Sequence, residues 1–209
     1  MIPTYQTLVD RFQQSLPGEI SHQSMYPRKG VPLDTLKAPS DARLSAVAIL
    51  LFEGTDYLQS IVIQRSVYEG THSGQIAFPG GKWEVDDASL KETALRECAE
   101  EIGVVADELD YIGKLTDVYT AVSSFLIEPH VFYWKTPHDQ LTLSEREVAA
   151  VYTLDLNNLL DDEIIQHMDV PIQKGVVLKN VPHFIFEEVK IWGATALMLS
   201  ELKEVLRSI

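Results

Sequence analysis

The chain has 209 residues, of which 31 are acidic and 17 basic, so its formal net charge is −14 and its length suits one domain with a sizeable core. The negative charge argues against a general basic surface for nucleic acid, and no apolar run approaches the roughly 20 residues that a membrane span needs. A single cysteine, Cys98, excludes an internal disulfide and suits a reducing compartment. From the charge, the hydropathy and the cysteine count together, we expect a cytoplasmic protein that binds neither nucleic acid nor membrane.

The first 42 residues are expected to be an appendage made of a helix and a loop. Residues 4–16 place Leu8, Phe12 and Leu16 at intervals of four, which predicts a helix with one apolar stripe. The following segment, to about residue 41, is rich in proline, glycine and serine and is expected to be a loop. Residues 43–209 are expected to form the main domain, including a C-terminal helix.

The main domain begins with β-strand patterns. Residues 44–54 and 57–66 are apolar, β-branched runs around a Gly-Thr-Asp turn, which predicts a hairpin. An extended stretch over residues 73–83 is broken at Pro79-Gly80-Gly81. The later elements are predicted as strands over 111–120, 125–134 and 146–156, a short helical turn over 157–160, a hairpin of 175–180 with 183–192, and a helix over 194–209.

A further helix is predicted from about Ser89 to Ile102. Ser89 and Glu92 have the spacing of a capping box, and Gly103 is a stop signal. Strands and helices alternate without a regular βαβ rhythm, so the expected fold class is α+β with a mixed sheet.

The central helix carries three carboxylates on one face. At about 100° per residue, Glu97, Glu100 and Glu101 share roughly one third of the helix surface. The predicted buried stripe consists of Leu95, Cys98, Ala99 and Ile102. A solvated acidic face is the simple interpretation, because such like-charged pairs cost an isolated helix only about 0.2–0.5 kcal/mol each. The preceding double glycine, however, lets backbone carbonyls approach closely, and carboxylates with carbonyls suit a divalent cation.

Residues 81–104, GKWEVDDASLKETALRECAEEIGV, resemble the Nudix box, whose usual form is G-x5-E-x7-R-E-U-x-E-E-x-G-U, where U is aliphatic. The second half is complete from Arg96 to Val104. Two positions depart from the pattern: Asp87 replaces the first glutamate and lies eight residues before Arg96 instead of seven, and Cys98 takes an aliphatic position. The resemblance implies a Nudix-type α/β/α sandwich with a mixed central sheet, and hydrolysis of a diphosphate linked to another group.

The longer spacing resembles the coenzyme A pyrophosphatase branch of the family. Upstream matches are Arg65-Ser66, His72, Gly74-Gln75 and Phe78-Pro79-Gly80-Gly81, and residues 147–156 and 191–196 look like later signatures of that branch. The resemblance implies cleavage of coenzyme A or acyl-coenzyme A to 3′,5′-ADP and (acyl-)4′-phosphopantetheine. Glu69-Gly70 replaces the branch's Leu-Arg, so ADP-ribose, NADH or another nucleoside diphosphate derivative is an alternative substrate. A non-catalytic nucleotide-binding module is a further alternative.

The resemblance also assigns roles to residues. Mg²⁺ or Mn²⁺ is expected on Glu97, Glu100, Glu101 and the Gly80 carbonyl, with Arg96 orienting Glu97. The general base is expected to be Glu147, ahead of Glu145, or else a box glutamate. The expected contacts to a small-molecule diphosphate are made by Arg65, Ser66, His72 and Gly81.

Two aromatic or apolar features are given structural interpretations. Trp83 is expected to pack within the protein, not to stack on a base. The C-terminal helix is expected to contribute to the core or to a homodimer contact.

Overall fold

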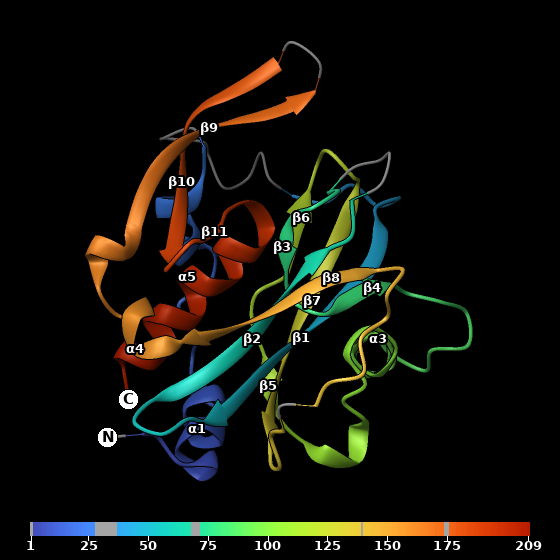
Figure 1. Ribbon diagram of the computed structural model, residues 1–209, viewed down its shortest axis with the longest axis vertical. Helices are drawn as coiled ribbons and strands as arrows, with labels where there is room; N and C mark the ends of the chain where they lie inside the picture. The colour runs from blue at the N-terminus through green and yellow to red at the C-terminus, as the bar shows by residue number, and fades with distance from the viewer. Residues whose placement is uncertain (1, 28–36, 68–71, 139, 174–175) are drawn as a thin grey trace.

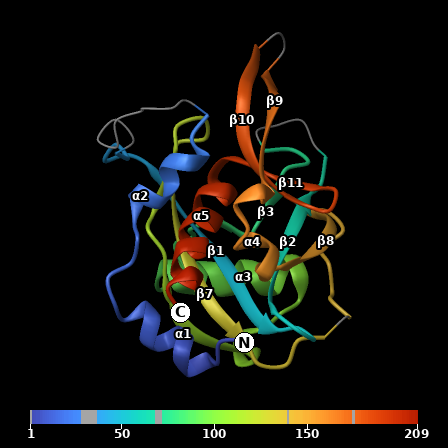
Figure 2. The ribbon, with the colours of Figure 1, turned by 90° about the vertical axis from the view of Figure 1, so that its left-hand side faces the viewer.

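The computed structural model describes residues 2–27, 37–67, 72–138, 140–173 and 176–209. A mixed β-sheet lies between helix α3 (Leu90–Ile102) on one face and helix α5 (Gly193–Arg207) on the other (Figures 1 and 2). The predicted α+β sandwich is confirmed. None of the helices in the described ranges is long and apolar enough to cross a bilayer.

Eight strands form the central sheet: β1 (Arg43–Glu53), β2 (Leu58–Arg65), β3 (Ile76–Ala77), β4 (Gly80–Lys82), β5 (Leu109–Lys114), β6 (Val118–Thr120), β7 (Phe125–Trp134) and β8 (Val148–Asp155). The predicted first hairpin is confirmed, because β1 and β2 pair antiparallel with Leu51 opposite Ser60. Strand β1 pairs in parallel with β7 and antiparallel with β4. Strand β8 pairs with β2, while β5 and β6 pair with β7.

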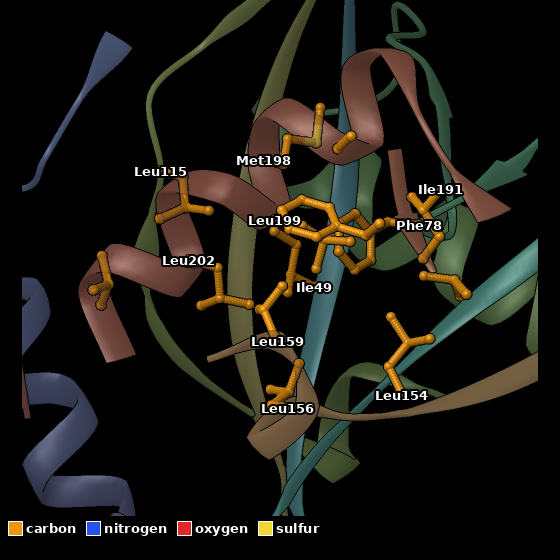
Figure 3. Close-up of a cluster of buried hydrophobic side chains, with 14 of the residues drawn as sticks. Ile49, Phe78, Leu115, Leu154, Leu156, Leu159, Ile191, Met198, Leu199 and Leu202 are labelled. Carbon is orange, nitrogen blue, oxygen red and sulfur yellow. The ribbon is translucent and has the colours of Figure 1, made fainter. Parts of the chain in front are cut away.

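Strand β1 is buried on both faces because it lies at the centre of the sandwich. Ala48 and Leu50 belong to the apolar cluster beneath α3, whereas Ile49 belongs to the cluster beneath α5. Figure 3 shows Ile49 and Phe78 close to Leu199 of α5. A continuous apolar run is what a strand covered on both faces requires.

The N-terminal segment has more structure than the sequence predicts. Helix α1 (Tyr5–Phe12) ends four residues before Leu16, which is only partly buried. The segment expected to be a loop contains helix α2 (Glu19–His22) and a 3₁₀ turn (Gln23–Met25). Leu8 and Met25 are fully covered within the core, so this segment packs against the main body. The domain boundary near residue 42 stays a prediction.

Two predicted strands are each divided in the structure. The stretch 111–120 forms β5 and β6, which pair with different parts of β7, and 73–83 forms β3 and β4, which pair with β2 and β1 respectively. The short helical turn is α4 (Leu156–Leu159), and short 3₁₀ turns cover Ala106–Glu108 and Asp162–Ile164.

The prediction for the late hairpin was wrong in its pairing. Residues 176–180 and 183–186 belong to one strand, β10 (Val176–Phe186), with an irregularity between Leu178 and Val181. Its partners are β9 (Ile165–Gln173), which the sequence analysis missed, and β11 (Val189–Ile191). The hairpin of β9 and β10 extends beyond the body of the molecule (Figures 1 and 2). This irregularity interrupts the alternation of side chains between the two faces of the strand, so the two halves of β10 were predicted as separate strands.

Candidate active site

Helix α3 begins and ends where its local signals predict. The Ser89 hydroxyl accepts a hydrogen bond from the Glu92 N–H at 3.2 Å, and Gly103 adopts the left-handed conformation, with φ of 77°, that ends the helix. These two signals fix the ends of the helix that carries Glu97, Glu100 and Glu101.

The buried face of α3 differs in part from the predicted stripe. Cys98 and Ile102 are fully buried as predicted, whereas Leu95 and Ala99 remain partly exposed. Glu101, expected on the open acidic face, is only 1% exposed. The helix is therefore rotated so that one carboxylate enters the protein interior.

Three carboxylates converge at the site. Oxygen atoms of Glu97, Glu101 and Glu147 all lie within 4.8 Å of one another. Glu147 reaches α3 because it precedes β8, and its carbonyl accepts a hydrogen bond from the Ser66 N–H at 2.9 Å, at the end of β2. We call Glu97, Glu101 and Glu147 the carboxylate cluster.

Glu100, predicted as a metal ligand, lies outside the carboxylate cluster. Its side chain is 57% exposed, and its Oε2 atom lies 3.3 Å from Nη1 of Arg96, one helical turn away. The structure thus separates the two adjacent glutamates of the box, with Glu101 inside the protein and Glu100 at the surface.

The double glycine allows the close approach of α3 to the sheet. The Gly80 N–H donates to Oε2 of Glu101 at 2.8 Å. A Cβ atom at Gly81 would lie 2.3 Å from Oε1 of Glu97, and one at Gly80 would lie 2.3 Å from the Ala46 carbonyl oxygen. Both positions therefore exclude a side chain in the observed arrangement. The role of the Gly80 carbonyl as a ligand stays a prediction.

Arg96 organises the acidic residues around it. Its Nε and Nη2 atoms each lie 2.9 Å from an oxygen of Asp87, and Nη1 donates to Oε1 of Glu97 at 2.9 Å. The hydrogen bonds from Arg96 hold the pKa of Asp87 far below its usual range. No role was predicted for Asp87 from the sequence, although its place at the first acidic position of the box was a signal that could have identified this partner of Arg96.

The electrostatics of the carboxylate cluster suit a bound cation. Burial raises the pKa of Glu101 to about 7, and the nearby charges of Glu97 and Glu147 add to this effect, against the Gly80 N–H and the Arg65 guanidinium. Burial also raises the pKa of Glu97. A divalent cation would offset the repulsion among the three carboxylates. Mg²⁺ and Mn²⁺ prefer oxygen ligands, which these carboxylates supply. The residues present therefore fit such an ion.

Of the predicted substrate contacts, Arg65, Ser66 and Gly81 adjoin the carboxylate cluster, whereas His72 is connected to it through Gln75 and Arg65. Nη1 of Arg65 is 3.4 Å from Oε1 of Glu101, and its side chain is 27% exposed. The backbone N–H of Arg65 donates to the backbone carbonyl of Gln75. The side-chain Oε1 of Gln75 is 2.9 Å from Nδ1 of His72. His72 thus supports the turn that leads to β3. Glu69-Gly70 lies outside the described residues.

The α+β sandwich with an acidic helix beside a double glycine belongs to a class of hydrolases that act on diphosphate compounds. Residues 42–174 match the NUDIX domain model, and the chain belongs to the Nudix hydrolase family. Members of this family cleave pyrophosphate bonds of nucleoside diphosphate derivatives and generally need divalent metal ions.

Individual relatives and a solved structure agree with this assignment. The chain is 30% identical over 205 residues to the Nudix hydrolase NudL of Yersinia enterocolitica, covering 96% of this chain and 92% of the relative. It is 26% identical over 185 residues to Nudix hydrolase 3 of Caenorhabditis elegans, covering 82% and 77%. The crystal structure of the Nudix hydrolase RenU from M. smegmatis shares the fold, with a TM-score of 0.55 at 13% identity over 80% of this chain and 88% of that chain.

Proposed function

We propose that this enzyme hydrolyses the diphosphate of coenzyme A or acyl-coenzyme A, releasing 3′,5′-ADP and (acyl-)4′-phosphopantetheine. The observation that carries the proposal is that residues of the upstream motif border the carboxylate cluster. Arg65 lies beside Glu101, Ser66 is hydrogen-bonded to the backbone of Glu147, and Gln75 is hydrogen-bonded to the backbone of Arg65. The motif thus borders the place where the diphosphate would bind.

Mg²⁺ or Mn²⁺ is proposed to be held by Glu97 and Glu101, with the Gly80 carbonyl and Glu100 as further ligands, while the neighbouring Glu147 carboxylate stays free to accept a proton. When bound, such an ion neutralises diphosphate charge and lowers the pKa of a bound water. A chain with a net charge of −14 needs this neutralisation for an anionic substrate. Arg96 keeps the Glu97 carboxylate in place, and the partly exposed Arg65 is positioned to hold a phosphate oxygen.

Glu147 is the proposed general base. It belongs to the carboxylate cluster, and among the residues that the structure describes it forms no ion pair with a lysine or arginine. Glu97 and Glu101 each have an arginine partner that already engages an oxygen of the carboxylate, whereas no such partner from the described part of the chain occupies the Glu147 carboxylate. Glu147 is therefore the member best suited to accept a proton from the attacking water.

The substrate proposal is tested by incubating the protein with coenzyme A and Mn²⁺ and separating the products by chromatography. We expect 3′,5′-ADP and 4′-phosphopantetheine in equal amounts. Intact coenzyme A alongside turnover of ADP-ribose or NADH would refute the proposed substrate. Glu69-Gly70 is the observation that favours this second candidate, since it replaces a cation expected near a coenzyme A phosphate with an anion.

The buried Cys98 suits the proposed cytoplasmic location.

A further inference from the structure

We propose that an apolar row of four side chains next to the carboxylate cluster, Trp83, Leu44, Leu126 and Tyr119, holds the nucleobase of the substrate, with Trp83 as its stacking platform. The inference rests on the proposed diphosphate site but not on coenzyme A being the substrate. It also revises the sequence-based interpretation of Trp83 as a packing residue.

The strand register places these four side chains in one line across the sheet. The Trp83 N–H donates to the Leu44 carbonyl at 3.0 Å, which extends the pairing of β4 with β1 by one residue. Leu44 pairs with Leu126 of β7, and Leu126 pairs with Tyr119 of β6. Since directly paired residues point to the same face of a sheet, all four lie on one face. The strands that carry them lie side by side in Figure 1.

The row is adjacent to the carboxylate cluster. Ala46 and Gly81 form the next pair along the same face, two residues from Leu44 and Trp83. Two residues along a strand span about 7 Å. Because the Glu97 carboxylate lies directly over Gly81, a diphosphate bound at the carboxylate cluster places its attached nucleoside within reach of the row.

The row is accessible and apolar. Leu44 is 41% exposed and Trp83 is 37% exposed, while Leu126 and Tyr119 are partly buried. Such a surface beside a diphosphate site favours a flat, weakly charged group over another phosphate. Trp83 Nε1 donates to the Asp87 carbonyl at 3.2 Å, and Asp87 is held by Arg96. The indole is therefore fixed before the substrate binds, which favours stacking with a planar base over contact with a flexible pantetheine chain.

Two non-hydrolysable probes separate the base from the diphosphate. Methylenediphosphonate carries only the two phosphorus groups, and adenosine 5′-(α,β-methylene)diphosphate carries the same groups with adenosine. Binding of each in Mg²⁺ is measured by calorimetry. We expect the wild-type protein to prefer the adenosine probe. Trp83→Ala should weaken that probe about tenfold and leave methylenediphosphonate unchanged, whereas Trp83→Phe should retain most of the affinity.

A matched control is Tyr57→Ala, which removes another exposed aromatic side chain at the turn between β1 and β2 and should change neither affinity. Equal wild-type affinity for the two probes, or an equal loss for both in Trp83→Ala, would overturn the proposal. If Trp83→Ala bound 4′-phosphopantetheine more weakly than wild type but bound the adenosine probe equally well, the row would belong to the other half of the substrate. That result would also overturn the proposal. Failure to cleave coenzyme A would refute only the proposed substrate, because neither probe contains pantetheine.

Discussion

Arg96 and Asp87 form a two-bond ion pair, with Nε 2.9 Å from Oδ1 and Nη2 2.9 Å from Oδ2. The same guanidinium donates to Glu97 at 2.9 Å. Asp87 therefore connects the loop before α3 to the carboxylate cluster through one arginine. It acts as a positioning residue, since its own carboxylate is turned towards Arg96, Thr93 and the Glu84 N–H.

Replacing Asp87 with Asn should lower both stability and activity. The substitution removes the charge that pairs with Arg96, and hydrogen bonds to charged groups contribute about 1.5–3 kcal/mol each. We expect the free energy of unfolding, measured with urea at pH 7, to fall by about 2 kcal/mol. Asp86→Asn is the matched control, because Asp86 is the exposed neighbour, and it should leave the unfolding curve unchanged.

The same pair predicts a pH dependence. Because Arg96 lowers the pKa of Asp87 in the folded state, the contribution of Asp87 to stability is fully present above its unfolded pKa of about 3.9 and is lost as the pH falls further. The stability difference between wild type and Asp87→Asn should therefore be constant above about pH 5 and decrease below about pH 4. A difference that grows in acid would contradict the assigned ion pair.

Glu147→Gln should reduce turnover by at least about a hundredfold, as expected for loss of a general base. Glu145→Gln is the control, since Glu145 lies two residues away, is exposed and is absent from the carboxylate cluster. The measurement is kcat at saturating Mn²⁺ and substrate. Equal losses in the two variants would remove Glu147 from the proposed role.

Gly81→Ala should affect activity more than folding. The new Cβ would displace only the end of the Glu97 side chain, which can move, so the protein should still fold. A displaced Glu97 carboxylate should cost about a hundredfold in turnover. Gly113→Ala provides the opposite case, because its Cβ would lie 2.8 Å from the Phe12 ring of α1, so it should lower stability by about 1–3 kcal/mol and change kcat little. Thermal unfolding and kcat, measured on both variants, check the contrast.

Glu101→Gln should separate metal binding from folding. Since burial raises the pKa of Glu101, its charge is unfavourable in the folded protein without a cation. In EDTA the variant should be at least as stable as wild type. Added Mn²⁺ should raise the melting temperature of wild type and raise that of the variant much less. An equal rise in both proteins would place the ion elsewhere.

Glu201→Ala should release the N-terminal segment. Glu201 of α5 is completely buried, and it accepts hydrogen bonds from the Gly18 N–H and from both the N–H and the hydroxyl of Thr116. Its Oε2 atom is also 3.3 Å from Nε2 of His22. Leaving these buried groups without a partner should cost about 3 kcal/mol or more. Limited proteolysis should then cut within residues 13–27, while Glu204→Ala, on the exposed side of α5, should not have this effect.

The parts of the fold that depend on nearby residues were predicted well. Helix α3 begins after Ser89 and ends before Gly103, because its cap and its stop are set by contacts within one turn. The first hairpin formed as predicted for the same reason. Strand β9 was missed and β10 was predicted as two strands, because the pairing of β9 with β10 is irregular. The sequence pattern of a strand also does not show which other strand it pairs with.

The candidate site was predicted in part. The sequence placed Glu97, Glu100 and Glu101 on one helix face, but the structure includes Glu97 and Glu101 in the carboxylate cluster and leaves Glu100 at the surface. The difference arises because the sheet covers the side of α3 that carries Glu101, where the Gly80 N–H donates to its carboxylate, and leaves Glu100 uncovered. A helical projection gives the angle of each side chain but not the side from which a neighbouring strand approaches.

The sequence by itself determined the acidic helix, its ends, the double glycine before it and the family to which the chain belongs, because these depend on residue types at short, defined spacings. Tertiary structure alone decided that Glu101 and not Glu100 joins Glu97 and Glu147, that Asp87 holds Arg96, and that Trp83 aligns with Leu44, Leu126 and Tyr119. Those relationships depend on strand pairing and on the packing of α3 against the sheet, and both bring together residues whose separation along the chain carries no information about their distance in space.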